Sequence, residues 1–236
     1  MATILLAHGA WSAAWAWKKM RPLMAAAGHA FFAPSYTGLG ERAHLAGPDV
    51  ELDTHIEDLL GVLHYEDLHD VVVLGHSYGG MVATGVADRA PARVTAAIYL
   101  DAFVPQHGQS LSDLVPVEQR ARMRSGAVNG DGWSVPPNPS PADTSPEDLA
   151  WIAGKRVPTP LKCFEQPLLL HGELTLPRAY IQAMRNAGGS FSTFAARARS
   201  EAGWRSYEID ASHSPNVTAP DALMAVLNTA LADMGK

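Results

Sequence analysis

Cysteine is nearly absent from this sequence, whose 236 residues contain only Cys163. No disulfide can form within the chain, so the fold has to rest on a hydrophobic core. A chain without disulfides suits a reducing compartment, and we predict a cytoplasmic location. The first nine residues contain no basic leader and no cleavage site, so we expect no signal peptide.

Long apolar runs and clusters of positive charge are also missing. No apolar segment approaches the roughly 20 residues of a membrane-spanning helix. The 18 basic residues are outnumbered by 24 acidic ones and form no basic run, so we expect neither nucleic acid nor a membrane as partner. The histidines and acids lack metal-ligand spacing and no glycine-rich phosphate loop occurs, so we expect no metal and no cofactor. A neutral or small substrate fits this composition best.

Short apolar runs alternate with segments of helical periodicity along most of the chain. The predicted strands are 3–7, 29–33, 71–74, 94–100, 179–184 and 204–209, and the predicted helices are 14–27, 53–63, 81–89, 191–202 and 220–234. Strands that alternate with helices form a mostly parallel, doubly wound sheet with right-handed crossovers. The sequence therefore predicts an α/β fold, and its length suffices for one domain with one sizeable core.

The alternation stops between residues 105 and 166. This segment contains short amphipathic pieces, such as 111–123, and a stretch at 135–146 that is rich in Pro, Ser, Asp and Asn. We predict that residues 105–166 form a mostly helical cap, inserted into a single core made of residues 1–104 and 167–236.

The run Gly75-His76-Ser77-Tyr78-Gly79-Gly80 lies between an apolar strand and a helix of small residues. This is the context of a nucleophile elbow, a sharp turn that lifts a serine hydroxyl above the edge of the sheet. Small residues flank the serine because larger side chains would clash with the turn. We predict that Ser77 is a nucleophile; the alternative is a glycine-rich structural turn.

A serine hydroxyl becomes a good nucleophile only when a base takes its proton. His213 follows the predicted strand 204–209 and precedes the last helix, which is the chain order expected of such a base. The alternative is a solvated loop histidine. The developing oxyanion needs backbone N–H donors, and the candidates are Tyr78, directly after the nucleophile, and Ala10, in the loop after the first strand.

Three motifs are similar to those of a known family. They are the opening run from His8 to Lys18 (HGAWSAAWAWK), the elbow, and the run from Tyr99 to Pro105 (YLDAFVP). They resemble the hydroxynitrile lyase and plant methylesterase branch of the α/β-hydrolases, especially its bacterial esterase-like members. The resemblance implies an α/β-hydrolase fold with a cap, a cofactor-free enzyme, and a small ester or cyanohydrin held between cap and sheet.

Two positions depart from the lyases of this branch. The lyases carry a threonine in the first loop and a lysine directly after the catalytic histidine, where this chain has Gly9 and Ser214. Without that lysine, no cation stabilises a departing cyanide. The sequence therefore favours ester hydrolysis through an acyl-enzyme over lyase chemistry.

A third departure concerns the acid that orients the histidine. In this family the acid follows the strand predicted at 179–184, where this chain has Asn186. An asparagine can hold the imidazole but cannot offset its positive charge. Asp101, at the carboxyl end of the predicted strand 94–100, is the best substitute, although it also fits a role in fixing the cap entrance through backbone hydrogen bonds. The sequence leaves this choice open.

Aromatic residues gather near the first loop, the elbow and the predicted cap. The candidate substrate-binding residues are Gly9, Trp11, Phe103, Trp133 and Trp151. For any single aromatic residue we expect core packing, since aromatic side chains dominate ordinary cores. Together they indicate an apolar pocket that accepts an aryl group.

Three functions are consistent with these residues. The leading one is a serine carboxylesterase of small esters, among them aromatic or methyl esters, or of lactones. The second is a lyase or cyclase-like biosynthetic enzyme, and the third a small-molecule-binding protein in which Asn186 marks a degraded triad. The expected partner is a small ester or lactone, and a homodimer is left open.

Overall fold

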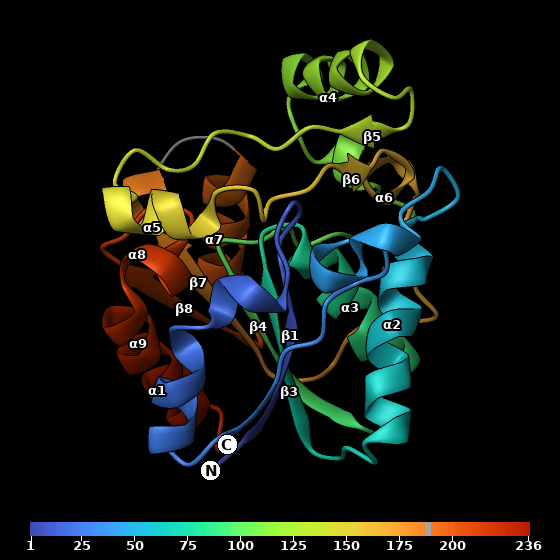
Figure 1. The fold of residues 1–236 in the computed structure, drawn as a ribbon. Helices are drawn as coiled ribbons and strands as arrows, with labels where there is room; N and C mark the ends of the chain where they lie inside the picture. Colours follow the sequence, from blue (N-terminus) through green and yellow to red (C-terminus); the bar gives the residue numbers. More distant parts are fainter. Residues whose placement is uncertain (187–189) are drawn as a thin grey trace.

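A six-stranded sheet runs through the centre of the computed structural model, which describes residues 1–186 and 190–236 (Figure 1). In spatial order its strands are β2 (Ala30–Phe32), β1 (Thr3–Ala7), β3 (Val71–His76), β4 (Val94–Leu100), β7 (Arg178–Ala183) and β8 (Trp204–Ile209). Every neighbouring pair is parallel, as the alternating pattern predicts. The carboxyl ends of the strands therefore meet at one edge of the sheet, which is where sites form in such folds.

Helices cover both faces of this sheet (Figure 1). On one face, α2 (Leu52–Tyr65), α3 (Gly79–Arg89) and α7 (Ser190–Ser200) share a hydrophobic core with the strands. On the other face, α1 (Met20–Ala26) and α9 (Pro220–Asp233) share a second core. Successive strand side chains alternate between the two, so that Leu5 packs in the first core and Leu6 in the second. Burial on both faces explains why these strands are unbroken apolar runs in the sequence.

Two amphipathic segments of the sequence each form a 3-10 turn followed by an α-helix, with a proline at or near the start of that helix. The helix predicted at 14–27 is a 3-10 turn, Ala14–Trp17, followed by α1. Pro22 has no backbone N–H to bond the carbonyl of Lys18, so one continuous helix cannot form there. The amphipathic stretch 111–123 is likewise split into a 3-10 turn, Leu111–Asp113, and α4 (Val117–Asn129), with Pro116 as the N-cap residue of α4.

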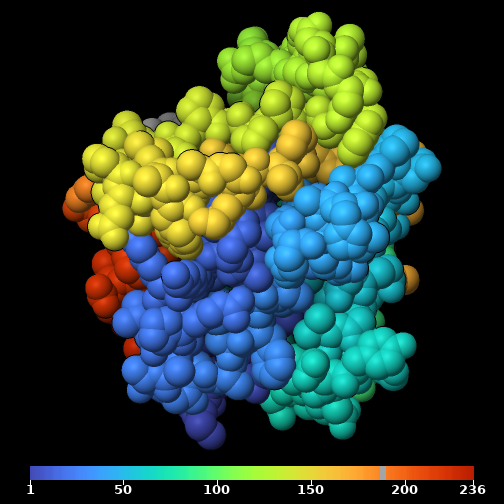
Figure 2. Space-filling view, in the orientation of Figure 1, coloured from blue at the N-terminus to red at the C-terminus, as the bar shows by residue number. Residues whose placement is uncertain are grey.

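The chain between β4 and β7 lies over the carboxyl edge of the sheet, as the green-to-yellow segments of Figures 1 and 2 show. Its remaining elements are β5 (Ser134–Val135), α5 (Pro146–Ile152), β6 (Thr159–Pro160) and α6 (Lys162–Glu165). β5 and β6 pair as a small antiparallel sheet, which the sequence did not reveal because each strand has only two residues. The segment is otherwise helical or irregular.

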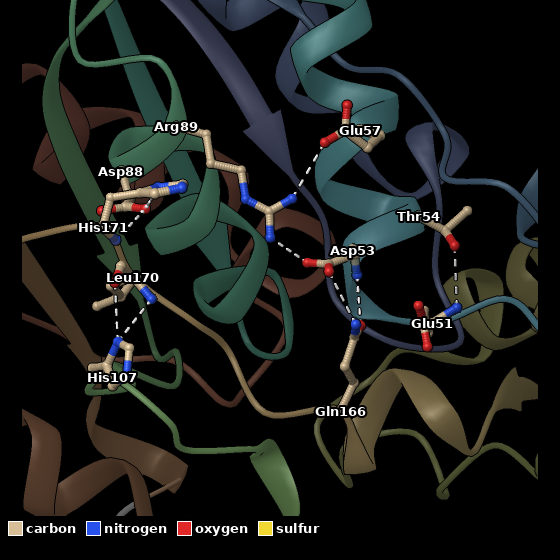
Figure 3. Close-up of polar contacts among 10 residues, drawn as sticks. All are labelled: Glu51, Asp53, Thr54, Glu57, Asp88, Arg89, His107, Gln166, Leu170 and His171. Carbon is tan, nitrogen blue, oxygen red and sulfur yellow. Dashed lines mark hydrogen bonds and ion pairs between the residues drawn. The ribbon is translucent and has the colours of Figure 1, made fainter.

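The two ends of this segment meet in a short antiparallel pairing, formed by residues 107–109 and 168–170 and called the neck below. The N–H of Gly108 donates to the carbonyl of Leu168 at 2.8 Å, and the N–H of Leu168 donates to the carbonyl of Gln109 at 2.9 Å. His107 contacts the backbone of Leu170 (Figure 3). The sequence predicts borders at residues 104–105 and 166–167, and each border lies just before one of the two segments of the neck.

Side chains of the core hold the chain on either side of the neck (Figure 3). Asp88 of α3 accepts hydrogen bonds from the backbone N–H of His171 at 3.0 Å and from its ring at 2.8 Å. Gln166 accepts from the N–H of Asp53 at 2.8 Å and donates to its carboxylate at 3.0 Å. The chain therefore enters and leaves the overlying segment at one fixed place.

In the described part of the chain, no helix combines the length and the apolar composition that crossing a membrane requires.

Candidate active site

Ser77 occupies the turn between β3 and α3 with a φ of 57°. This left-handed conformation is unusual for a residue with a side chain and is typical of a nucleophile elbow. The turn is held by the backbone, because the carbonyl of Ser77 accepts from the N–H groups of Gly80 and Phe103, both at 3.1 Å. The hydroxyl is thereby fixed at the carboxyl edge of the sheet.

The glycines that follow the serine are required by close packing. A Cβ added to Gly79 would lie 1.9 Å from the carbonyl oxygen of Ala7, and one added to Gly80 would lie 2.0 Å from that of Phe103. Both contacts are with backbone atoms, which cannot move aside cheaply. The start of α3 therefore packs directly on the loops that surround the site.

His213 and Asp101 complete a hydrogen-bonded chain that begins at Ser77. His213 Nε2 lies 2.9 Å from Ser77 Oγ, and His213 Nδ1 lies 2.6 Å from Asp101 Oδ2. Because a buried carboxylate accepts at Nδ1, that nitrogen carries the proton and Nε2 is free to accept from the serine hydroxyl. The geometry is that of a nucleophile, a general base and an orienting acid.

Asp101 is buried and its carboxylate is fully engaged. Its side chain is 1% exposed, whereas that of His213 is 27% exposed. Asn186 Nδ2 donates to Oδ2 at 2.7 Å, and the N–H of Ala183 donates to Oδ1 at 3.4 Å. Asn186 Nδ2 also lies 3.3 Å from His213 Nδ1, and both nitrogens donate to the same carboxylate oxygen. Asn186 therefore contacts the carboxylate of Asp101 and helps to hold it in place.

Two further side chains fix the position of His213. His76 Nε2 donates to the carbonyl of His213 at 2.7 Å, and the ring of Phe191 stacks on the imidazole with centroids 4.8 Å apart. Burial, reinforced by the nearby His213, lowers the pKa of His76 to about 3. His76 is therefore neutral near pH 7 and adds no positive charge beside the base.

The loop after β1 approaches the nucleophile closely. A Cβ on Gly9 would lie 3.2 Å from the Cβ of Ser77, so a larger residue would crowd the reacting centre. His8 Nδ1 donates to the carbonyl of Gly9 at 2.9 Å, and His8 Nε2 accepts from the N–H of Tyr36 at 3.2 Å. This buried histidine orients the peptide that precedes Ala10.

Ala10 and Tyr78 flank the nucleophile, and their backbone N–H groups make no hydrogen bond within the described ranges. The side chain of Tyr78 points elsewhere, because its hydroxyl bonds His55 Nδ1 at 2.9 Å. The hydroxyl of Tyr78 is thus engaged away from Ser77, whereas its backbone N–H is unpaired in the part of the chain that the structure describes. Trp11 has a φ of 57° and is tied to the small sheet, since its N–H donates to Thr159 Oγ1 at 2.9 Å.

Ser77 and His213 line a cavity of about 450 Å³ beneath the overlying segment. Of the predicted substrate-binding residues, Gly9, Trp11 and Phe103 line it. Trp133 and Trp151 do not. Trp133 belongs to the turn before β5, and Trp151 packs edge-on against Trp15 at 5.7 Å, so that only Trp15 of that pair reaches the wall.

The chain matches the model of the alpha/beta hydrolase family over residues 4–226. The chain is an α/β-hydrolase. A Carbendazim hydrolyzing esterase from Nocardioides sp. (strain SG-4G) is 37% identical over 234 residues, which cover 94% of this hydrolase and 97% of that protein. Methylesterase 1 from Arabidopsis thaliana is 30% identical over 110 residues, which cover 46% of this hydrolase and 42% of that protein.

Among solved structures, the hydrolase resembles an extracellular alpha/beta-hydrolase from a Paenibacillus species described as a structural and functional homologue of tobacco salicylic acid binding protein 2. The TM-score is 0.86 at 22% identity, with 98% of this hydrolase and 99% of that chain covered. The fold and the resemblance to the esterase branch are thus confirmed. The cytoplasmic location and the homodimer stay predictions.

Sequence reasoning missed three parts of the site in this hydrolase. Phe191 was assigned only to a helix, yet it stacks on His213. Residues 138–142 line the cavity although their composition is that of a surface loop, and Arg156 lines it from the chain before β6. No periodicity marks residues 138–142 or Arg156, because irregular segments leave no pattern that assigns a side chain to one face.

Among the described residues, no group of three or more potential ligands could hold a metal ion.

Proposed function

We propose that this α/β-hydrolase is a serine carboxylesterase that cleaves small esters through an acyl-enzyme. The observation that carries the proposal is the continuous hydrogen-bonded chain from Ser77 Oγ through His213 to Asp101 Oδ2. Full-length similarity to a bacterial esterase supports the same reaction class. We further propose that residues 105–166 act as the cap that closes the substrate cavity.

The geometry supports a two-step reaction. Ser77 Oγ attacks the ester carbonyl carbon while His213 Nε2 takes the hydroxyl proton, and the N–H groups of Ala10 and Tyr78 stabilise the oxyanion. The imidazolium then protonates the departing alcohol, which leaves an acyl-Ser77. Water, deprotonated by His213, attacks this acyl group, and the imidazolium then returns the proton to the departing Ser77 Oγ as the carboxylic acid is released. Asp101 keeps the proton on Nδ1 and offsets the charge of the imidazolium throughout.

The two alternative functions have less support. A degraded triad is disfavoured because Asp101 supplies a carboxylate at 2.6 Å from His213, whatever residue stands at 186. A lyase is disfavoured because Ser214, next to the base, offers no positive charge for a departing anion. The aromatic wall formed by Trp11, Phe103 and Phe191 favours substrates that carry an aryl group.

The rate of ester hydrolysis by the Ser77→Ala variant, compared with that of wild type, tests this function. The panel contains p-nitrophenyl esters, methyl esters of aryl acids, a lactone and carbendazim, with Ser200→Ala as a matched variant of an exposed serine on α7. We expect wild type and Ser200→Ala to hydrolyse the same esters and Ser77→Ala to lose about 10³-fold or more in kcat.

A fluorophosphonate probe provides a second readout. Mass spectrometry is expected to find one adduct, on Ser77, in wild type and none in Ser77→Ala. Turnover that survives in Ser77→Ala, or a wild type that neither hydrolyses an ester nor takes the probe, would refute the esterase and favour the lyase or the binding protein.

A further inference from the structure

The wall of the cavity carries positive charge and no negative charge. The hydrolase has 24 acidic residues and a formal net charge of −6, yet none of the described residues that line the cavity is Asp or Glu. Two arginines, Arg156 and Arg185, do line it. This distribution is the reverse of the overall composition, which by itself favours a neutral or small substrate.

Arg185 is neutralised by the protein itself. Its Nε and Nη2 donate to the two carboxylate oxygens of Asp210 at 2.8 and 2.9 Å, and its Nη1 lies 4.0 Å from Asp143. A bidentate pair of this kind satisfies the planar guanidinium. Arg185 therefore joins the loops that carry Asn186 and His213 and has little charge left for a ligand.

Arg156 lacks such a partner. Within residues 1–186 and 190–236 its guanidinium makes one hydrogen bond, from Nη1 to the carbonyl of Asn138 at 2.5 Å, and no ion pair. The side chain is partly buried, and this burial lowers the pKa of Arg156, although a guanidinium stays charged in proteins. A charged guanidinium that has no carboxylate partner among the described residues and lies in the wall of a cavity can form charge-assisted hydrogen bonds with an anionic ligand.

Arg156 and Ser77 belong to the wall of the same cavity but to different parts of it. Ser77 lies at the edge of the sheet, and Arg156 lies in the overlying segment between α5 and β6. A cavity of about 450 Å³ is large enough for a ligand of ordinary metabolite size that reaches both. An ester group held at Ser77 would thus place the remote end of its substrate beside a cation.

We infer that the cavity selects esters that carry a carboxylate at the end remote from the scissile bond, with Arg156 as the group that binds this carboxylate. The substrate class is the half-ester of a dicarboxylic acid. This inference rests on the proposed esterase function, since it names the substrate of the same site. Arg156 is then a specificity-determining residue, and it takes no part in the bond-breaking step.

A purely structural role for Arg156 makes a different prediction. Through Asn138 the guanidinium also holds residues 138–142, which line the cavity. Loss of that contact would disturb the wall for every substrate alike. Loss of a carboxylate-binding charge would affect only substrates with a carboxylate, so paired substrates separate the two roles.

The test compares half-esters with their isosteric amides. Monomethyl succinate, adipate, suberate and terephthalate are each paired with the ester in which the free carboxylate is a carboxamide. The kcat/KM of each pair is measured for wild type, Arg156→Met, Arg156→Lys and Arg122→Met, the last an exposed arginine on α4 that does not line the cavity.

For at least one pair we expect wild type to prefer the half-ester. Arg156→Met should lower the half-ester to amide ratio about 10- to 100-fold, mainly through KM, because one charge-assisted contact is worth a factor of that order. Arg156→Lys should retain part of the wild-type preference for the half-ester. Arg122→Met should have the same half-ester to amide ratio of kcat/KM as wild type.

The inference is overturned by a wild type that prefers the amide in every pair, or by a ratio that Arg156→Met leaves unchanged. An equal loss on both members of a pair also overturns it and assigns Arg156 to holding residues 138–142. Failure of the esterase function looks different, since neither member is then cleaved in a Ser77-dependent way.

Discussion

Two side chains, Asp101 and Asn186, lie where the family pattern has a single acid: Asp101 hydrogen-bonds His213, and Asn186 hydrogen-bonds Asp101. Asn186 stands at the position where the acid is expected, but it donates to the carboxylate of Asp101, which reaches His213 from the neighbouring strand. The sequence could not decide between the two because both follow strands whose carboxyl ends lie side by side. The choice depends on side-chain direction, and Asp101 has a φ of 41°, which no sequence pattern indicates.

A swap of the two residues tests this arrangement. Asp101→Asn should lower kcat by about 10³- to 10⁴-fold, since an amide stabilises the wrong tautomer and cannot offset the imidazolium. In the double variant Asp101→Asn, Asn186→Asp a carboxylate returns beside His213 Nδ1, and part of the lost kcat should return. Steady-state kinetics on a neutral ester provide the measurement.

Asn186→Asp alone serves as the control for this swap. It places a second carboxylate against the first, and two such close groups cannot both ionise without raising a pKa. We expect no gain in kcat/KM at neutral pH and an acid limb of the pH profile that moves upward. A gain in Asn186→Asp, with no loss in Asp101→Asn, would assign the acid to position 186.

Ser77 and His213 could be predicted because each depends on chain order and a short motif. The structure brings both together with the two predicted oxyanion residues. The aromatic residues were less predictable. Trp133 and Trp151 lie in the overlying segment as expected, yet they do not reach the cavity, because the rotation of a short helix or turn is set by tertiary contacts.

At the scale of elements, the elbow depends on how closely α3 approaches β1. Gly79 lies where any side chain would meet the carbonyl of Ala7. The glycines of this motif therefore serve packing as well as the turn itself. The sequence predicts the elbow because its glycines are adjacent to the serine, whereas the amphipathic patterns of 14–27 and 111–123 do not indicate the breaks near Pro22 and Pro116.

Gly79→Ala tests this close approach. The added methyl group would force α3 away from β1 and should lower the free energy of unfolding by about 3 kcal/mol or more, with loss of activity. Gly61→Ala in α2 is the matched control, because no atom lies within 4 Å of its added Cβ. That variant should gain about 0.5 to 1 kcal/mol. Urea unfolding followed by tryptophan fluorescence measures both, and equal effects would contradict the packing argument.

At the scale of the whole molecule, three buried histidines link stability to pH. Burial lowers the pKa of His8, His55 and His76 to about 3 each, from an ordinary value of 6.5. Between those values the unfolded chain binds more protons than the folded one, so unfolding becomes easier as pH falls. His8 lies in the loop after β1, His55 in α2 and His76 in β3. Because these elements pack together, we expect acid to destabilise the whole fold.

We expect the free energy of unfolding to fall by about 4 kcal/mol between about pH 7 and pH 5.5, roughly one third of it from each histidine. In His55→Gln the amide can still bond Thr37 and Tyr78 but does not titrate, so the dependence should shrink by about a third. His64→Gln, at an exposed position of α2, should leave it unchanged. Urea unfolding at both pH values measures these free energies. A wild type whose free energy of unfolding does not change between the two pH values would contradict the role given to the buried histidines.

The fold itself followed from the sequence because parallel strands covered on both faces are short unbroken apolar runs. The segment between β4 and β7 was harder to predict. Its two-residue strands and irregular connections carry no periodicity, and only the end of the alternating pattern marked its borders. Arg156 lies in this segment and lines the cavity. The composition of the whole chain, which favours a neutral or small substrate, cannot show where a single cation lies.

The neck has a consequence for how such an enzyme can change its substrate. Because residues 107–109 and 168–170 pair with each other, the chain leaves the sheet and returns to it at neighbouring points. We expect that insertions and deletions between these two segments leave the register of the sheet unchanged. We therefore expect the segment that carries Arg156 to vary in length and sequence among related enzymes more readily than the sheet edge that carries Ser77 and His213.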